Sequence, residues 1–394
     1  MKRIILVLVL LCLLPRTVLA AAPEVESKSA LLMELTTGQV LGEQNPDEPL
    51  APASVTKIMT MLLIMEAIDS GALSWDDTVT VSEAAAAKGG SQVYLKVGET
   101  MSVSDMVKSI AVSSANDCAC AMAEHIAGSE AAFVDLMNAR AKELGMANTH
   151  FVNCTGLDDS PEAAQHRTTA RDIAIMSREL IGKHPDIVKY TTIWTDSIRN
   201  GAFGLSNTNK LVRFYPGATV LKTGFTSGAG YCLSATAQRE GLQLIAVVMG
   251  AETSAKRFTS CKQLLDYGFA SFALYTPELG QVTLPVVLGK EDRVALTLAD
   301  HNPLLVEKGK KAGITAAFTL EEQLAAPVAP GARAGTMTIS SGGEVLAEIP
   351  IIAASGVEKL TLWDQFLRLL SQAAFGSAGP TANASRTPTE TIAP

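Results

Sequence analysis

The sequence predicts an α+β protein: helices flank an antiparallel sheet that a helical insertion interrupts, and a small C-terminal β-sandwich domain follows. Three observations predict this fold. Two strand-like segments within residues 29–41 are separated from three more, within residues 219–249, by a long region of helical patterning. The turns between the later strands are too short for the crossovers that parallel neighbours need, so these strands should be antiparallel. Period-two alternation of apolar residues after residue 275 then indicates a second, β-rich domain.

The N-terminus has the features of a secretory signal peptide over residues 1–20. A basic start at residues 1–3 precedes an apolar run over residues 4–14, and Val18 and Ala20 occupy positions −3 and −1 of a cleavage site. The apolar run is too short to span a bilayer. We therefore expect an exported protein that works outside the cytoplasm.

The composition limits the possible partners and cofactors. A net charge of −8 and a pI near 5.3 argue against a nucleic-acid partner, which would require a basic surface. The histidines are few, and neither a CxxC nor an HExxH motif occurs, so we expect no metal and no other cofactor. Apart from Cys12 in the signal peptide, an odd number of cysteines remains, which leaves at least one thiol unpaired in a monomer. We expect most of them to be small buried apolar residues. They are Cys118, Cys120, Cys154, Cys232 and Cys261.

We place the first domain at residues 21–273. Its first two strands, at residues 29–35 and 36–41, are joined by a glycine-containing turn. The helix over residues 55–68 is apolar almost all round, as in a helix buried on every side, and Ser70-Gly71 ends it. Helical patterning continues to about residue 210 and includes residues 103–127 and 130–144.

The end of the first domain is rich in strands. Residues 219–225, 231–239 and 242–249 are strand-like, and short glycine-containing turns separate them. Residues 254–267 return to helical spacing and close the domain.

The second domain is expected at residues 274–356. Four of its segments alternate at period two, as in the short strands of a small β-sandwich. They are residues 281–288, 293–298, 336–339 and 345–349. No chemical motif occurs in this domain, so we interpret it as a spacer or a docking module.

Residues 357–375 are expected to form an amphipathic helix, and residues 376–394 a disordered tail rich in Ala, Ser, Thr and Pro. Such a helix can lie in a membrane interface, or it can pack on its own domain. Lys359 and Arg368 are its only basic residues, so electrostatic attraction to lipid is weak. The apolar residues assigned to it are Leu360, Trp363, Phe366, Leu367, Leu370, Ala374 and Phe375.

The first chemical motif is Ser54-x-x-Lys57, at the start of the apolar helix. Residues three apart on a helix share a face, so the two side chains are within reach of each other. Serine becomes a nucleophile when a base takes its proton, and lysine can be that base only if burial or a nearby cation keeps it neutral. The alternative is a polar helix start beside a lysine whose stem is buried and whose charge reaches solvent.

Two further motifs occur once each. Ser114-x-Asn116 lies before an apolar helix, where both residue types are also common as caps. Lys222-Thr223-Gly224 lies on a predicted strand, where Lys and Thr could bind a carboxylate and Gly permits close approach to the backbone. Each motif alone is a weak signal. Their combination, in the order Ser-x-x-Lys, Ser-x-Asn, Lys-Thr-Gly, is a strong one.

This ordered set resembles the penicillin-interacting serine acyltransferases, whose fold is that of penicillin-binding proteins and β-lactamases. Longer stretches around the motifs are similar to the low-molecular-mass D-alanyl-D-alanine carboxypeptidases, as are the signal peptide, the second domain and the terminal helix. These stretches are residues 52–60, 113–117, 155–159, 207–211 and 222–226.

The resemblance implies a role for each motif residue. Ser54 is the acylated nucleophile and Lys57 its base, while Ser114 relays a proton to the leaving group. Asn116 holds the substrate amide and orients Lys57. The backbone N–H groups of Ser54 and Phe225 form the oxyanion hole, where donors face the negative charge of the tetrahedral intermediate.

The remaining implied residues bind the substrate. Lys222 and Thr223, within the Lys-Thr-Gly motif that Gly224 completes, bind the terminal carboxylate of the leaving D-alanine, and Arg257 lies near it. Lys222 is also expected to keep Lys57 neutral by like-charge repulsion. The implied partners are peptidoglycan stem peptides ending in D-Ala-D-Ala, β-lactam inhibitors and a membrane surface, at the outer face of the bacterial cytoplasmic membrane.

Two positions depart from many relatives: Val220 stands where Gly is usual, and Phe225 where some relatives have His. Both departures bring the rate and the substrate preference of the enzyme into question, but not its reaction class. One competing hypothesis is a β-lactamase, but residues 158–165 contain no Glu-x-x-x-Asn pattern to position a hydrolytic water. The other is a non-catalytic wall-binding or penicillin-sensing protein, which would have no use for a base beside a nucleophile.

Overall fold

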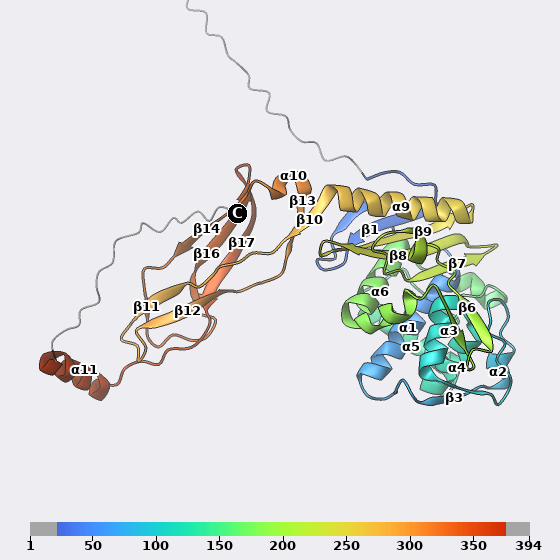
Figure 1. Ribbon diagram of the computed structural model, residues 1–394, viewed down its shortest axis with the longest axis horizontal. Coiled ribbons are helices and arrows are strands. Elements are labelled where there is room, and N and C mark those ends of the chain that lie inside the picture. The colour runs from blue at the N-terminus through green and yellow to red at the C-terminus, as the bar shows by residue number, and fades with distance from the viewer. Residues whose placement is uncertain (1–21, 376–394) are drawn as a thin grey trace, which may run out of the picture.

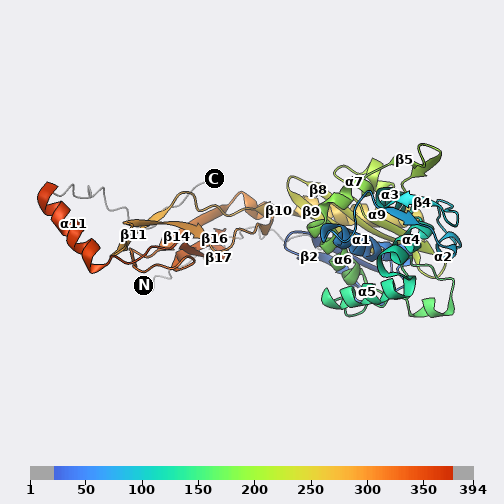
Figure 2. The same cartoon turned by 90° about the horizontal axis from the view of Figure 1, so that it is seen from below.

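The structure is a computed structural model that describes residues 22–375, with side chains through residue 370. The predicted signal peptide and the predicted disordered tail lie outside the described residues. Two bodies follow each other along the chain: a rounded α+β domain and an elongated β-rich domain that carries a helix at its far end (Figures 1 and 2).

The first domain is built on a five-stranded sheet with the order β2-β1-β9-β8-β7. Every pairing within it is antiparallel, which confirms the prediction. The sheet joins the two ends of the domain, because β1 near the N-terminus pairs with β9. Strand β7 lies at one edge of the sheet. The strands are β1 Ser29–Glu34, β2 Val40–Gln44, β7 Lys222–Thr226, β8 Gly230–Arg239 and β9 Leu242–Ala251.

Helices bury both faces of this sheet. Helix α9 (Ser254–Ser271) covers one face, and α1 (Lys57–Asp69) and α6 (Ala170–Lys183) lie on the other (Figure 1). Successive residues of a strand point to opposite faces. Leu31 therefore belongs to the core beside α1, and Leu32 to the core beside α9.

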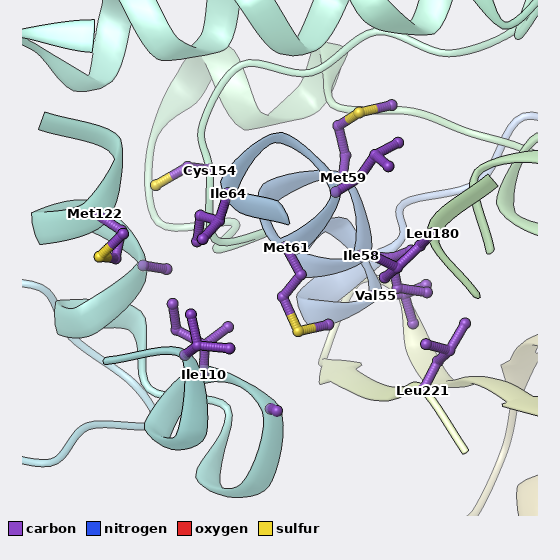
Figure 3. Close-up of a cluster of buried hydrophobic side chains, with 14 of the residues drawn as sticks. Val55, Ile58, Met59, Met61, Ile64, Ile110, Met122, Cys154, Leu180 and Leu221 are labelled. Carbon is purple, nitrogen blue, oxygen red and sulfur yellow. The ribbon is translucent and has the colours of Figure 1, made fainter. Parts of the chain in front are cut away.

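Helix α1 is the centre of the larger core (Figure 3). The first turn of the expected helix is a 3-10 turn, Ala53–Thr56, and α1 continues from it. Each fully buried Ile, Leu or Met contributes about 1.5–3 kcal/mol, so this helix is firmly anchored. Side chains from several other elements surround it, among them Ile110, Met122, Cys154, Leu180 and Leu221.

The helical patterning over residues 103–127 belongs to two helices, α3 (Val103–Ser113) and α4 (Asn116–Ala127). The start of α4 agrees with the prediction that the Ser-x-Asn motif precedes an apolar helix. Ser114 takes a left-handed conformation, with φ of 64°, and ends α3. Helix α5 (Glu130–Glu143) agrees with the expectation. The shorter elements of the domain are β3 Thr78–Thr80, α2 Glu83–Ala86, β4 Thr100–Ser102, α7 Val188–Thr191, β5 Thr195–Ile198, β6 Phe203–Ser206 and α8 Leu211–Phe214.

The second domain begins as α9 runs directly into β10 (Phe272–Tyr275), which pairs with β13 (Leu304–Glu307). Its main sheet has the order β14-β16-β17-β12-β11-β15. The domain therefore contains this six-stranded sheet and the two-stranded sheet of β10 and β13, and buried side chains from most of its strands form a single core. Its remaining elements are α10 Lys308–Lys311, β11 Thr283–Val287, β12 Arg293–Leu298, β14 Ile314–Leu320, β15 Leu324–Ala325, β16 Arg333–Ser341 and β17 Glu344–Ala353.

The terminal helix, α11 (Leu362–Phe375), begins five residues later than predicted. The preceding residues belong to the β-rich domain, because the N–H of Val357 donates to Val328 O and that of Leu360 donates to Leu288 O. Leu360 is therefore not part of the helix face to which it was assigned. Figure 2 shows α11 at the end of the molecule remote from the first domain.

Candidate active site

Ser54 and Lys57 meet as the spacing predicted. The Nζ of Lys57 donates to Ser54 Oγ at 3.0 Å and to the carbonyl of Thr155 at 2.8 Å. Lys57 is fully buried, and burial lowers its pKa to about 7, although Cys154 and Asp117 act in the opposite direction. In a large fraction of the molecules Lys57 is thus neutral near physiological pH, and its amine has a lone pair that can take the proton of Ser54.

Close backbone packing holds the turn that carries Ser54. A Cβ on Gly224 would lie 2.7 Å from Pro52 O and 3.1 Å from Ser54 N, so only glycine lets β7 approach this turn. The motif glycine was expected to admit a ligand. In the structure, the space beside Gly224 is occupied by the backbone of the turn that carries Ser54.

The Ser-x-Asn motif occupies the break between α3 and α4. Ser114 is buried there, and Asn116 Nδ2 donates to Gly89 O at 2.7 Å. The buried Oδ1 of Asn116 has no hydrogen-bond partner among the described residues. The prediction that Asn116 orients Lys57 is therefore not met, since the Nζ of Lys57 donates to Ser54 and Thr155.

Lys222 and Thr223 lie on the edge strand beside the nucleophile. Lys222 is buried and donates to Thr223 O at 3.0 Å. Burial lowers the pKa of Lys222 well below its usual value, and the nearby charges of Lys57 and Arg257 lower it further. The expected repulsion thus acts on Lys222, and burial alone lowers the pKa of Lys57.

Arg257 and two aromatic residues form the rim beyond the motif. Arg257 Nη1 donates to Gly224 O at 3.1 Å, and its guanidinium lies 5.4 Å from the ring centre of Tyr231. Phe225 stacks on Tyr231 with ring centroids 4.2 Å apart and is 53% exposed. Phe225 therefore offers an apolar surface at the mouth of the site.

These groups surround one open pocket of about 250 Å³. Lys57, Asn116 and Lys222 are not part of its lining; they lie in the buried layer that supports it. The predicted residues that line it are Ser54, Ser114, Thr223, Gly224, Phe225 and Arg257.

The lining includes three residues for which no role was predicted: Ser91, Thr208 and Tyr231. Thr208 lies within the matched stretch 207–211, and its hydroxyl is 2.7 Å from that of Thr223. Ser91 is in a loop without a motif, and this loop is tied to α4 because Asn116 N donates to Ser91 O. Only the resemblance over residues 207–211 could have identified one of the three.

Within residues 22–370 no group of three or more His, Cys, Asp or Glu side chains is placed to bind a metal ion. The five described cysteines are all buried free thiols, which confirms their interpretation as small buried residues.

Comparison with known proteins identifies the family. A sequence model described as D-alanyl-D-alanine carboxypeptidase matches residues 16–253, and one described as the C-terminal domain of penicillin-binding protein 5 matches residues 277–359. The D-alanyl-D-alanine carboxypeptidase DacF of Bacillus subtilis is 43% identical over 341 residues, which cover 85% of this chain and 86% of that protein. The chain belongs to the D-alanyl-D-alanine carboxypeptidase family.

Solved structures agree with this assignment. Penicillin-binding protein 5 from Haemophilus influenzae matches this carboxypeptidase with a TM-score of 0.74 and 30% identity, over 86% of this chain and 100% of that one. Penicillin-binding protein D2 from Listeria monocytogenes, in its ampicillin-bound form, matches with a TM-score of 0.57 and 35% identity, over 62% and 98% of the two chains. The predicted fold class and the predicted class of enzyme, a serine-type carboxypeptidase, are confirmed.

Proposed function

We propose that Ser54 is the nucleophile with which this carboxypeptidase removes the terminal D-alanine of peptidoglycan stem pentapeptides. Ser54 Oγ attacks the carbonyl carbon between the two D-alanines, the C–N bond breaks, and D-alanine leaves with a proton on its amine. Water then hydrolyses the Ser54 ester and releases the shortened peptide. The observation that carries this proposal is the 3.0 Å contact between Ser54 Oγ and a buried lysine of lowered pKa.

The proton follows a short route. Neutral Lys57 takes the proton of Ser54 during the attack. Ser114, which lines the same pocket, gives its hydroxyl proton to the leaving amine and takes the proton from Lys57 in return, so that Lys57 is neutral again. The N–H groups of Ser54 and Phe225 face the developing oxyanion, and such donors can be worth about 10²–10³ in rate each.

The substrate's terminal carboxylate is bound by Lys222, Thr223 and Arg257. Burial and the charges of Lys57 and Arg257 lower the pKa of Lys222 in the free protein, and an entering carboxylate, as an opposite charge, would raise it. Arg257 Nε and Asn116 Oδ1 are buried polar atoms without partners among the described residues. Buried polar atoms of this kind are costly unless satisfied. We assign the substrate's terminal carboxylate to Arg257 Nε and the substrate amide N–H to Asn116 Oδ1.

Penicillin should bind covalently at the same serine, because its lactam imitates the D-Ala–D-Ala amide. The carboxylates of the segment where a β-lactamase would position its hydrolytic water, Asp158, Asp159 and Glu162, are exposed and do not line the pocket. The penicilloyl ester should therefore be long-lived. This argues against the β-lactamase alternative.

We further propose that the protein is exported by residues 1–20 and held at the outer face of the cytoplasmic membrane by α11. The apolar side chains of this helix point away from the protein: Leu362 is 86% exposed and Trp363 64%. Its polar residues Asp364, Gln365 and Arg368 are partly buried instead. A helix packed on its own domain would show the opposite pattern. None of the described helices is long and apolar enough to cross a membrane.

The activity is tested by incubating the mature protein with a peptide that ends in D-Ala-D-Ala and measuring free D-alanine. We expect release by the wild-type protein and none by Ser54→Ala, with both proteins folded. Retention of release by Ser54→Ala would overturn the assignment of the nucleophile, and absence of release by the wild type would favour the non-catalytic sensor.

A further inference from the structure

Thr56 lies between nucleophile and base in the sequence, yet its side chain does not line the pocket. Its Oγ1 is 2.8 Å from Ala53 O and 2.9 Å from Nε2 of His166, a residue 110 positions away. Both Thr56 and His166 are buried. The structure thus joins the turn of the nucleophile to a histidine that the proposed reaction does not use.

The direction of this chain of hydrogen bonds is fixed at both ends. The N–H of Val152 donates to His166 Nδ1 at 3.3 Å, so Nδ1 carries no proton and Nε2 does. At the other end, Ala53 O can only accept, so the single hydroxyl proton of Thr56 goes to it. Thr56 must then accept from His166 Nε2–H, which is the tautomer that Val152 also requires.

Ala53 is a residue whose conformation needs such support. Its φ of 49° lies in the left-handed region, which costs about 1–3 kcal/mol outside glycine and persists only where neighbours enforce it. Gly156 packs directly against the same carbonyl, since a Cβ there would lie 1.8 Å from Ala53 O. The hydroxyl of Thr56 adds a side-chain hydrogen bond to this carbonyl.

The carbonyl of Ala53 and the N–H of Ser54 belong to one planar trans peptide, so they point in opposite directions. Fixing the carbonyl on Thr56 therefore fixes the direction of the Ser54 N–H on the other side. Ser54 N lies on the side facing β7, where a Cβ on Gly224 would approach it to 3.1 Å. The Ser54 N–H thus lies on the side of the pocket formed by β7, and the second proposed oxyanion donor, the Phe225 N–H, belongs to that strand.

We propose that Thr56 and His166 are positioning residues that hold the Ala53–Ser54 peptide so that the Ser54 N–H points at the oxyanion. This rests on the proposed function, which makes that N–H one of two oxyanion donors. Arg257 holds the peptide of the second donor in the same way, through Gly224 O. Because Arg257 also faces the substrate carboxylate, Thr56 and His166 allow the cleaner test.

The test uses two pairs of variants in the full mature chain. Thr56→Val and His166→Leu remove the hydrogen bonds, while Thr56→Ser and His166→Gln keep a hydroxyl and an N–H donor. Melting temperatures first establish that each variant is folded. Stopped-flow acylation by a fluorescent penicillin then separates noncovalent binding from the acylation step. A peptide boronic acid, which forms a reversible tetrahedral adduct with a serine hydroxyl, reports on the oxyanion site alone.

We expect Thr56→Val and His166→Leu to lower both the acylation rate constant and the boronate affinity by a factor on the order of 10 to 100, with noncovalent penicillin binding unchanged. For Thr56→Ser and His166→Gln, the acylation rate constant and the boronate affinity should stay within about threefold of the wild-type values. The proposal is overturned if the Val and Leu variants acylate at the wild-type rate. It is also overturned if the folded Ser and Gln variants lose as much acylation rate and boronate affinity as the Val and Leu variants.

A measurement on the wild-type protein covers the case in which the variants fail to fold. Nitrogen-15 NMR should show His166 as the Nε2–H tautomer, and the Nδ1–H tautomer would overturn the proposal. Failure of the proposed function is recognised separately, because penicillin would then label a residue other than Ser54. If Ser54 is labelled at the wild-type rate in all four variants, only the positioning proposal fails.

Discussion

Lys57 donates to a hydroxyl and to a backbone carbonyl, and neither group carries a charge. Its burial is therefore not offset by an ion pair, and its pKa falls to about 7. The Ser-x-x-Lys spacing predicted that the two side chains meet, because helical geometry brings residues three apart together. Their interpretation as nucleophile and base also required the other two motifs.

The first prediction concerns pH. Only neutral Lys57 can take the proton of Ser54, so the penicillin acylation rate should rise with pH, with a midpoint near 7, and level off above about pH 8. Rates measured from pH 5.5 to 9 test this. A profile that is flat across this range would show that Lys57 is not the base.

The second prediction replaces the base. Lys57→Arg keeps the positive charge but cannot supply a neutral base, because guanidinium does not deprotonate in proteins. Acylation should fall by a factor on the order of 10² to 10⁴. Lys96→Arg, on the exposed surface, is the matched control. Near-normal acylation by Lys57→Arg would assign the base to another group.

The third prediction concerns stability. The folded-state pKa of Lys57, about 7, lies below the ordinary 10.5, so the unfolded chain binds more protons between these values and stability rises with pH there. The shift corresponds to about 5 kcal/mol, more than the roughly 1–3 kcal/mol of a lost buried hydrogen bond. Lys57→Met should therefore melt at a higher temperature than wild type at pH 7, by a margin that shrinks toward pH 10. A Lys57→Met protein less stable than wild type at pH 7 would contradict the burial argument.

At the scale of elements, the site depends on how closely β7 approaches the turn of Ser54. The sequence predicted β7 and the helix but not their contact, because a glycine on a strand can admit a ligand or another backbone. The Ser-x-Asn motif predicted the start of α4, but not the left-handed conformation of Ser114 that ends α3. A non-glycine residue gives no local signal for that conformation.

The fourth prediction tests that approach. Gly224→Ala would place a Cβ 2.7 Å from Pro52 O, so β7 must move away from Ser54 and acylation should fall by at least about tenfold. Gly228→Ala, in the turn after β7, meets only the end of the Asp158 side chain and should acylate like wild type. Equal rates for the two variants would mean that the contact between β7 and the turn does not matter.

At the scale of the whole molecule, the elongated β-rich domain separates the active site from α11 (Figure 2). Hydrophobic periodicity predicted the domain order and the amphipathic character of the helix. It could not decide where the helix begins or which of its faces meets the domain, since residues 357–360 have no Gly or Pro to stop a helix from forming earlier. Tertiary pairing with Val328 and Leu288 decides the first point.

The fifth prediction concerns attachment. A chain ending at Thr361 keeps the pairing of residues 357–360 and lacks α11, so it should no longer float with liposomes but should release D-alanine as fast as the full mature chain. Trp363→Ser should weaken flotation, because the side chain is exposed and burying it contributes at most about 1.5–3 kcal/mol. Gln365→Ala, on the partly buried face, is the control. Equal flotation of the truncated and full chains would show that α11 is no anchor.

The most direct test of the central claim is to trap the acyl-enzyme. The mature protein is incubated briefly with penicillin, digested, and analysed by mass spectrometry. We expect one penicilloyl group per chain, attached to Ser54, absent from Ser54→Ala, and stable long enough to be isolated. A penicilloyl group on any other residue, or the absence of an adduct on the folded wild-type protein, would contradict the account.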